Sequence, residues 1–372
     1  MRLHDRYLFR ELLTPLAYCL GGFLVFWISY FFFTELDKMQ EHRLHLLDCM
    51  EYAVAMTPGF FVMVLPIALL LALLYALTHH ARHHELTALR AAGVSLWRLC
   101  APYFVIGVAA GGIYFLLNEV AVPRGTQWAE DILGRYVQTD RGPKAKTHFT
   151  KIGFRIHSNR IWQVGEYDAT TKNMANPNVT WTLPDGSWRA LQADRAEYTN
   201  GVWTFYDAQL FTQSGARGNL IPSFITNVIA MPDFDETPKQ ILSDIKLSDS
   251  QTVHRSRSAD IPLKELHEYL RLHPNLPMDE KHTLLTKYYG RLAAPWTCLV
   301  VVLIAIPFGA SSGRRNLIFG VAGSIFICFA FFVLQQVSLA LGQNGEMPGW
   351  LAAWMPNLLF AAAGTILILR TR

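Results

Sequence analysis

Long apolar runs alternate with charged segments toward both ends of the chain. The runs cover residues 13–33, 60–77, 99–117, 292–308, 317–341 and 350–369. A helix needs about 17 to 25 mostly apolar residues to cross the hydrocarbon core of a bilayer. The pattern therefore predicts six membrane-spanning helices, three before and three after a long polar segment.

The polar segment has the periodicity of a sheet. Short stretches of β-branched and aromatic residues follow one another across residues 148–231 and are separated by turn residues. Two of these turns contain Asp185-Gly186 and Asn200-Gly201, which are dipeptides that favour tight hairpins. Many short strands at regular spacing predict a β-sandwich or a jelly roll.

The two patterns divide the chain into four parts. These are an N-terminal membrane half (residues 1–118), an all-β domain (119–260), a connector (261–290) and a C-terminal membrane half (291–372). Leu263, Leu266 and Leu270 recur at helical spacing, so the connector is expected to contain a helix. The expected fold class is a helical membrane protein of three plus three spans with an inserted jelly-roll-like domain.

Lysine and arginine gather in four segments between the apolar runs or at their ends. They are the N-terminal segment with Arg2, Arg6 and Arg10, the loop of residues 79–98, the loop with Arg314 and Arg315, and the end with Arg370 and Arg372. With six spans all four lie on one side, which the positive-inside rule places in the cytoplasm. Both termini are then cytoplasmic and the β domain is periplasmic. The first run is too long for a signal peptide and lacks a small-x-small cleavage site after it, so we interpret it as a retained span.

The chain shows no recognisable catalytic or nucleotide-binding motif. It has no HExxH or GxSxG sequence, and the stretch Gly309–Gly313 is followed by Arg-Arg instead of the Lys-Ser or Lys-Thr of a phosphate-binding loop. The five cysteines lack metal-ligand spacing and are interpreted as small apolar residues. We expect no catalytic residue, no metal, no cofactor and no nucleic-acid partner.

Any transport by this chain therefore needs energy from a gradient or from a partner. Gradient-driven carriers place ionisable residues inside the membrane, and the predicted spans contain almost none. Gln335 and Gln336 in the fifth span are interpreted as an interhelical hydrogen bond, with a transport site as the alternative. A partner ATPase fits this composition better.

The loop of residues 79–98 contains a histidine cluster, His79-His80-x-x-His83-His84. Histidines at helical spacing of four can share a metal ion, but no carboxylate arrangement completes such a site. We interpret the cluster as a solvated face at the membrane interface.

The same loop has the pattern of a docking helix at about residues 80–93. One apolar stripe is formed by Leu86, Leu89, Gly93 and Leu96. Glu85 and Arg90 flank the stripe, and Gly93 is suited to end the helix in the left-handed conformation. A short helix held between two spans can pass motion from a soluble ATPase to the membrane helices. The alternative is a helix that only lies on the lipid surface.

Several motifs resemble the lipopolysaccharide-export permeases, the LptF/LptG family. The main one is Glu85-x-x-Ala88-x-Arg90-Ala91-x-Gly93-x-Ser95, and the others are Arg6-Tyr7 with Arg10-Glu11-Leu12-Leu13, Glu119-Val120-x-Val122-Pro123, Arg291-Leu292-x-x-Pro295 and Ile306-Pro307-Phe308-Gly309. Their order and spacing match both membrane halves, while the β region is similar in type and position.

The resemblance implies a permease subunit of the bacterial inner membrane that pairs with a paralogous subunit and is driven by a cytoplasmic ABC ATPase. Such a complex extracts lipopolysaccharide and passes it through the β domain to a periplasmic bridge of similar jelly-roll domains. The implied ATPase-docking residues are Glu85, Leu86, Leu89, Arg90 and Gly93. Lys38 falls where the family places basic residues against lipid A phosphates.

Further cations at the same predicted level of the membrane are Arg43, Arg124, Lys287 and Arg291. A cation at the outer interface attracts an anionic head group, although it can equally serve as an interfacial anchor. We name Lys38, Arg43, Arg124 and Arg291 as candidate head-group contacts. Two other functions stay open, an importer permease and a membrane-anchored scaffold or sensor that binds an envelope ligand without transport.

Overall fold

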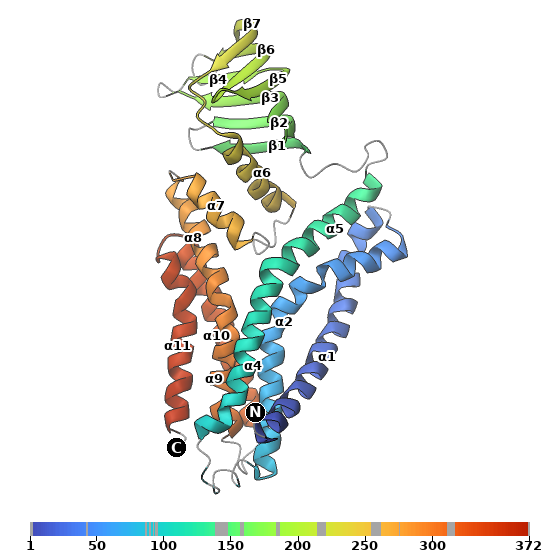
Figure 1. The fold of residues 1–372 in the computed structure, drawn as a ribbon, viewed down its shortest axis with the longest axis vertical. Coiled ribbons are helices and arrows are strands. Elements are labelled where there is room, and N and C mark those ends of the chain that lie inside the picture. Colours follow the sequence, from blue (N-terminus) through green and yellow to red (C-terminus); the bar gives the residue numbers. More distant parts are fainter. Residues whose placement is uncertain are drawn as a thin grey trace. The chain divides into compact units, whose positions relative to one another are not determined.

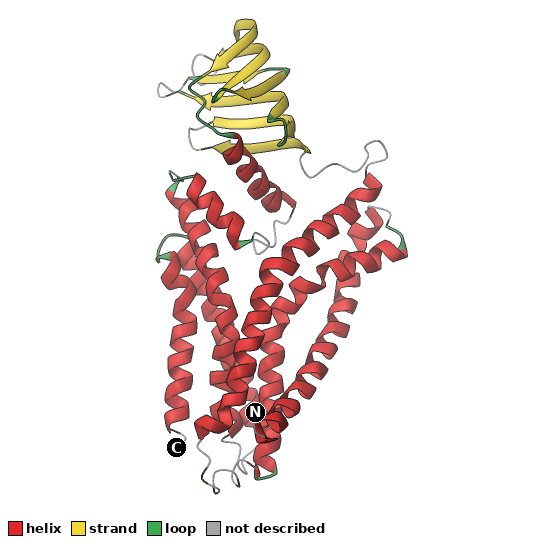
Figure 2. Ribbon diagram, in the orientation of Figure 1, coloured by secondary structure: helices red, strands yellow, loops and turns green. Residues whose placement is uncertain are grey.

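The computed structural model contains two compact units. It describes residues 3–41, 44–85, 88, 91, 93, 96–137, 148–156, 160–183, 187–213, 221–253, 262–274, 276–310 and 317–370. The helical unit combines Met1–Val137 with Met278–Arg372, and the β unit is Gln138–Pro277 (Figure 1). Helices form nearly all of the first unit, and strands form most of the second (Figure 2).

The helical unit contains long helices from both ends of the sequence. They are α1 (Leu3–Glu41), α2 (Leu46–Arg82), α4 (Leu96–Leu116), the π-helix η1 (Leu117–Ala121), α5 (Val122–Val137), α8 (Met278–Ala293), the 3-10 helix η2 (Ala294–Trp296), α9 (Thr297–Ala310), α10 (Leu317–Gln343) and α11 (Gly349–Arg370). By length and composition, six helical segments of the described chain can cross a membrane: Arg6–Asp37, Leu46–Arg82, Arg98–Leu133, Met278–Pro307, Ile325–Gln343 and Gly349–Leu369. The predicted helical membrane class is confirmed.

Two helices extend well past their predicted limits. The second helix begins at Leu46, ahead of the predicted start at residue 60, because the acidic side chains of its first turns have a partner. Arg135 donates to Glu51 Oε2 at 2.7 Å and lies 3.3 Å from Asp48 Oδ1. The hydrogen bond to Glu51 raises the pKa of the Arg135 guanidinium above its ordinary value.

The third span also continues further than its predicted end at residue 117. It runs through η1 into α5, which packs against α2 with Ala129 and Ile132 buried beside Tyr52 and Ala55. Residues 119–137 therefore group with the helices, whereas the sequence placed the boundary with the β domain at residue 118.

The core of the helical unit lies where α2 and α9 meet. Leu69, Leu73 and Leu77 of α2 are buried in one cluster with Val301 and Ala305 of α9. Helix α1 packs against α2, and α10 and α11 pack against each other. In Figure 1, α1 begins, α2 ends, α4 begins and α11 ends at the same end of this unit.

The β unit is built on a seven-stranded antiparallel sheet in the described part of the chain. Its strands are β1 (His148–Ile156), β2 (Arg160–Asp168), β3 (Asn173–Thr182), β4 (Trp188–Gln192), β5 (Arg195–Thr199), β6 (Val202–Gln213) and β7 (Ile221–Met231). The order is β1-β2-β3-β4-β6-β5, with β7 beside β6 and an added β3–β5 pairing. The expected β character is confirmed, and the finer jelly-roll arrangement stays a prediction.

One of the two predicted hairpins can be followed in detail. Asn200 and Gly201 have φ values of 52° and 86°, and the flanking Thr199 and Val202 pair across the turn. Positive φ at both central residues is the geometry of a type I′ turn, so this hairpin is confirmed. The Asp185-Gly186 hairpin lies outside the described residues.

Two helices complete the β unit. The connector helix is α7 (Leu263–Leu272), in which Leu266 is buried as its spacing predicted. The other helix, α6 (Pro238–Val253), packs against β1 and was not predicted. Thr237 and Gln240 cap its start reciprocally, since Gln240 N donates to Thr237 Oγ1 at 3.3 Å and Thr237 N donates to Gln240 Oε1 at 2.8 Å.

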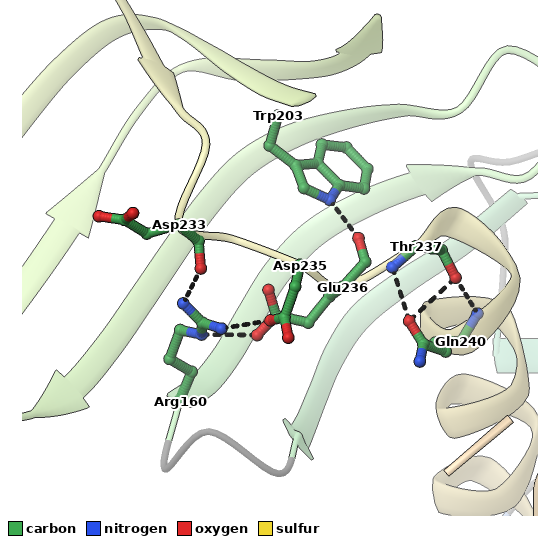
Figure 3. A network of polar contacts seen from close by, with 7 residues as sticks. All are labelled: Arg160, Trp203, Asp233, Asp235, Glu236, Thr237 and Gln240. Carbon is green, nitrogen blue, oxygen red and sulfur yellow. Dashed lines mark hydrogen bonds and ion pairs between the residues drawn. The ribbon is translucent and has the colours of Figure 1, made fainter. Parts of the chain in front are cut away.

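A buried arginine fastens the segment before α6 to the sheet (Figure 3). Arg160 Nε donates to Glu236 Oε1 at 2.6 Å, and Arg160 Nη2 donates to Asp235 Oδ1 at 2.6 Å. Trp203 Nε1 donates to the Glu236 carbonyl at 2.7 Å. These bonds hold the segment of Asp235 and Glu236 against the aromatic core of the β unit. In this core the ring centroids of Trp162 and Trp203 lie 5.8 Å apart.

Candidate functional site

The candidate coupling loop begins with a tight turn at the end of α2. The backbone N–H groups of His83 and His84 donate to the carbonyls of His79 and Ala81, both at 3.2 Å. His84 then adopts a left-handed conformation with φ of 58°. This reversal directs Glu85 back toward the helix that precedes it.

Glu85 is bonded to both of the first two helices. His80 Nδ1 of α2 lies 2.7 Å from Glu85 Oε2, and Tyr7 of α1 donates to Glu85 Oε1 at 3.3 Å. The His80 side chain is only 1% exposed. Because an ionised carboxylate only accepts hydrogen bonds, the Nδ1–H group of His80 is the donor in this contact. Nε2 has no hydrogen-bond partner among the described residues.

The interpretation of the histidine cluster as one solvated face is wrong for His80. His80 is buried, whereas His83 and His84 are exposed. The signal that reveals this is spacing, because His80 follows Leu73 and Leu77 on the buried stripe of α2. Among the described residues, no group of three or more His, Cys, Asp or Glu side chains is placed to hold a metal ion.

The structure describes only some of the other candidate coupling residues. Gly93 is exposed with φ of 82°, so the predicted left-handed conformation at this position is confirmed. Leu86, Leu89 and Arg90 lie outside the described residues, and their apolar stripe stays a prediction.

The structure separates the candidate head-group cations. Arg124 is exposed on α5, while Arg291 is buried on α8 with 9% exposure. Arg291 Nη2 donates to the Asn118 carbonyl at 2.9 Å. Asn118 belongs to the π-helix η1, in which the regular α-helical hydrogen-bond pattern is interrupted, and its carbonyl accepts this bond from the arginine. Lys38 belongs to α1, but the structure does not describe its side chain. Arg43 lies outside the described residues.

Together these features define a multi-pass membrane protein that carries a separate antiparallel β unit. A family model described as lipopolysaccharide export system permease LptF/LptG matches residues 6–370, nearly the whole chain. The chain belongs to this family, which confirms the resemblance drawn from its motifs. None of the curated proteins compared with the chain gives a significant match.

Membership in this family implies a general role and a location for the chain. It implies the role of a lipopolysaccharide-export permease, which is generally a non-catalytic part of a transporter. It also implies a multi-pass protein of the inner membrane that works with other components of the export system.

Proposed function

We propose that this chain is the permease subunit of an ATP-driven complex that extracts lipopolysaccharide from the outer leaflet of the inner membrane. The family match over residues 6–370 is the observation that carries the proposal. Near the common end of α1, α2 and α4, the described chain carries Arg6, Arg10, Arg82 and Arg98. The positive-inside rule then supports a cytoplasmic position for that end and for both termini.

Energy enters through a cytoplasmic ABC ATPase that docks on residues 80–93. Support comes from Glu85, which is bonded to His80 of α2 and Tyr7 of α1. A displacement of the loop therefore acts on two membrane helices at once. Gly93, in its left-handed conformation, sets the other limit of the docking helix.

On the lipid side, the exposed cation Arg124 is the head-group contact that the described structure favours. Only 6% of the apolar window in the first span and 22% of that in the fifth are buried within the chain. These surfaces are available to lipid and to a second permease subunit, either a paralogue or another copy.

Lipopolysaccharide then passes along the jelly-roll-like β unit to a periplasmic bridge of similar domains. In the described sheet, β1 pairs only with β2, and β7 pairs only with β6. Each outer edge therefore presents backbone groups that a strand of another domain can pair with.

Co-expression with candidate ATPases tests the proposal. The chain is captured through a tag on the β unit, and the retained ATPase is quantified. We expect the pair Glu85→Lys with Gly93→Trp to abolish retention, because it reverses a charge and fills an exposed turn. Arg98→Gln, at an exposed position on α4 outside the proposed docking residues 80–93, is the control and retains the ATPase. Equal retention by wild type and the double variant contradicts docking at this loop.

A further inference from the structure

A large groove lies between α1 and α2 at the end of the helical unit where the chain begins. Its volume is about 1200 Å³. The lining residues on α1 are Tyr7, Arg10, Glu11, Thr14, Pro15, Tyr18 and Cys19, and those on α2 are Leu71, Leu74, Tyr75, Thr78, His79, Arg82 and His83. Both sets follow the spacing of a single helix face, so the groove runs continuously along two antiparallel helices.

The groove is polar at one end and apolar at the other. The polar end is lined by Tyr7 and Arg10 of α1 and by Arg82 at the end of α2. Cys19 and Leu71 form the opposite, apolar end. Cys19 lies twelve positions after Tyr7, which is about 18 Å at the rise of an α-helix. This is the dimension of a lipid head group together with the upper part of its acyl chains.

Positive charge dominates the polar end. Arg10 and Arg82 are both exposed, and neither guanidinium has an ion-pair partner among the described residues. A smaller hollow of about 540 Å³ adjoins the groove, shares Arg10, Thr14 and Tyr18 with it, and adds Arg6. Glu11 is the opposing carboxylate in the lining. The groove lining itself holds two arginines and one glutamate, and Glu85, which accepts from Tyr7, is already bonded to His80. With Arg6 in the adjoining hollow, the excess of arginine makes the polar end complementary to an anion.

Aromatic residues mark the level of the groove in the membrane. The side chain of Tyr18 is 77% exposed and that of Tyr75 is also exposed, although both line the groove. Tyrosines gather at the boundary between head groups and acyl chains, because the ring is apolar and the hydroxyl is polar. The arginines therefore lie at head-group level, with the apolar end of the groove directed into the bilayer.

We propose that this groove binds an anionic glycerophospholipid of the leaflet at that end of the unit. The phosphate contacts Arg10 and Arg82, and the acyl chains extend along Leu71, Leu74 and Cys19. This lipid is a resident ligand and not the transported one, which under the topology above lies in the other leaflet. The site does not depend on ATPase docking, although Tyr7 both lines the groove and donates to Glu85 of the coupling loop.

Photolabelling of the full-length chain, co-purified with its partner subunits in nanodiscs, tests the site. The probe is phosphatidylglycerol with a photoreactive acyl chain, and phosphatidylcholine with the same chain is the comparison. We expect phosphatidylglycerol to label residues 7–19 and 71–83 about tenfold more than phosphatidylcholine does, since two arginines contact the phosphate. The variant pair Arg10→Gln with Arg82→Gln should reduce this labelling to the phosphatidylcholine level.

Arg98→Gln removes an exposed cation from α4 that does not line the groove, and it should keep the full preference. Unchanged thermal unfolding of the paired variant shows that a loss of labelling is not a loss of folding. Equal labelling by both lipids would overturn the proposal and assign the groove to ordinary annular lipid. A photoreactive residue at position 75 that captures a partner polypeptide would also overturn it, because a protein then fills the groove.

Discussion

The Nδ1 atom of His80 lies 2.7 Å from Glu85 Oε2, which attaches the candidate coupling loop to the buried face of α2. The glutamate belongs to the proposed docking motif, and the histidine is buried in the helical unit. A contact between a docking residue and a core residue is what a loop needs in order to move a helix rather than only to bind a partner.

His80→Leu should therefore uncouple the loop from α2 without preventing ATPase binding. The substitution keeps an apolar side chain in the core but removes the donor to Glu85, at a cost of about 1 kcal/mol in the free energy of unfolding. We expect retention of the ATPase on the captured chain to be unchanged, and lipopolysaccharide release per ATP hydrolysed to fall several-fold. His80→Asn, whose amide nitrogen can take the place of Nδ1, should restore coupling. If His80→Leu and His80→Asn release lipid equally well, His80 does not position the loop.

The two carboxylates beside Arg160 should differ sharply in their contribution to stability. The Glu236 side chain is 1% exposed and that of Asp235 is 82% exposed. Glu236→Gln removes the buried one of the two carboxylates that pair with Arg160 and leaves only the exposed Asp235, so this should cost up to about 3 to 5 kcal/mol. Asp235→Asn should cost less than about 1 kcal/mol, as for an exposed ion pair. Denaturant unfolding followed by tryptophan fluorescence measures both, because Trp203 donates to the Glu236 carbonyl. Similar costs for both variants would contradict the assigned burial.

Gly125 is required for the contact between α5 and α2. A Cβ atom added at Gly125 would overlap the carbonyl oxygen of Ala55, while one added at Gly112 would meet nothing within 4 Å. Gly125→Ala should lower the thermal midpoint in detergent, because a backbone atom has to move. Gly112→Ala is the matched control, and it should leave the midpoint unchanged or raise it, since alanine is favoured over glycine by about 1 kcal/mol in a helix. A midpoint that rises equally in both variants would mean that α5 does not approach α2 so closely.

Substitutions at Arg291 and Arg124 should have different effects, because Arg291 stabilises the fold and Arg124 is the proposed lipid contact. Arg291→Met leaves the buried Asn118 carbonyl without its donor, so we expect destabilisation of about 1 to 3 kcal/mol. Arg124→Gln changes an exposed side chain and should leave the thermal midpoint unchanged while reducing cross-linking of lipopolysaccharide to the helical unit by a few-fold. The reverse pattern, with a stable Arg291→Met and an unstable Arg124→Gln, would exchange the two roles.

Local sequence patterns were sufficient to predict the elements that nearby residues determine. A bilayer core demands long uninterrupted apolar runs, so the membrane helices could be predicted, and Asn200-Gly201 specifies its own turn geometry. The start of α2 could not be predicted in this way, because Asp48 and Glu51 are matched by Arg135, far along the chain.

The candidate site follows the same division. Gly93 could be identified because the left-handed conformation favours glycine, and Glu85 could be identified from a motif. The bond from His80 to Glu85 could not, because it depends on the turn at His83 and His84 that brings Glu85 back toward α2. The groove between α1 and α2 depends on how two helices pack, which neither helix shows by itself.

The most direct test of the central claim follows lipopolysaccharide into the β unit. The complete complex is reconstituted with lipopolysaccharide in the membrane, and a photoreactive residue replaces Trp181 on β3. We predict cross-links to lipopolysaccharide that require ATP and disappear when Glu85→Lys and Gly93→Trp are introduced together. Cross-links that form equally without ATP, or that persist in the double variant, would contradict ATP-driven extraction through the coupling loop.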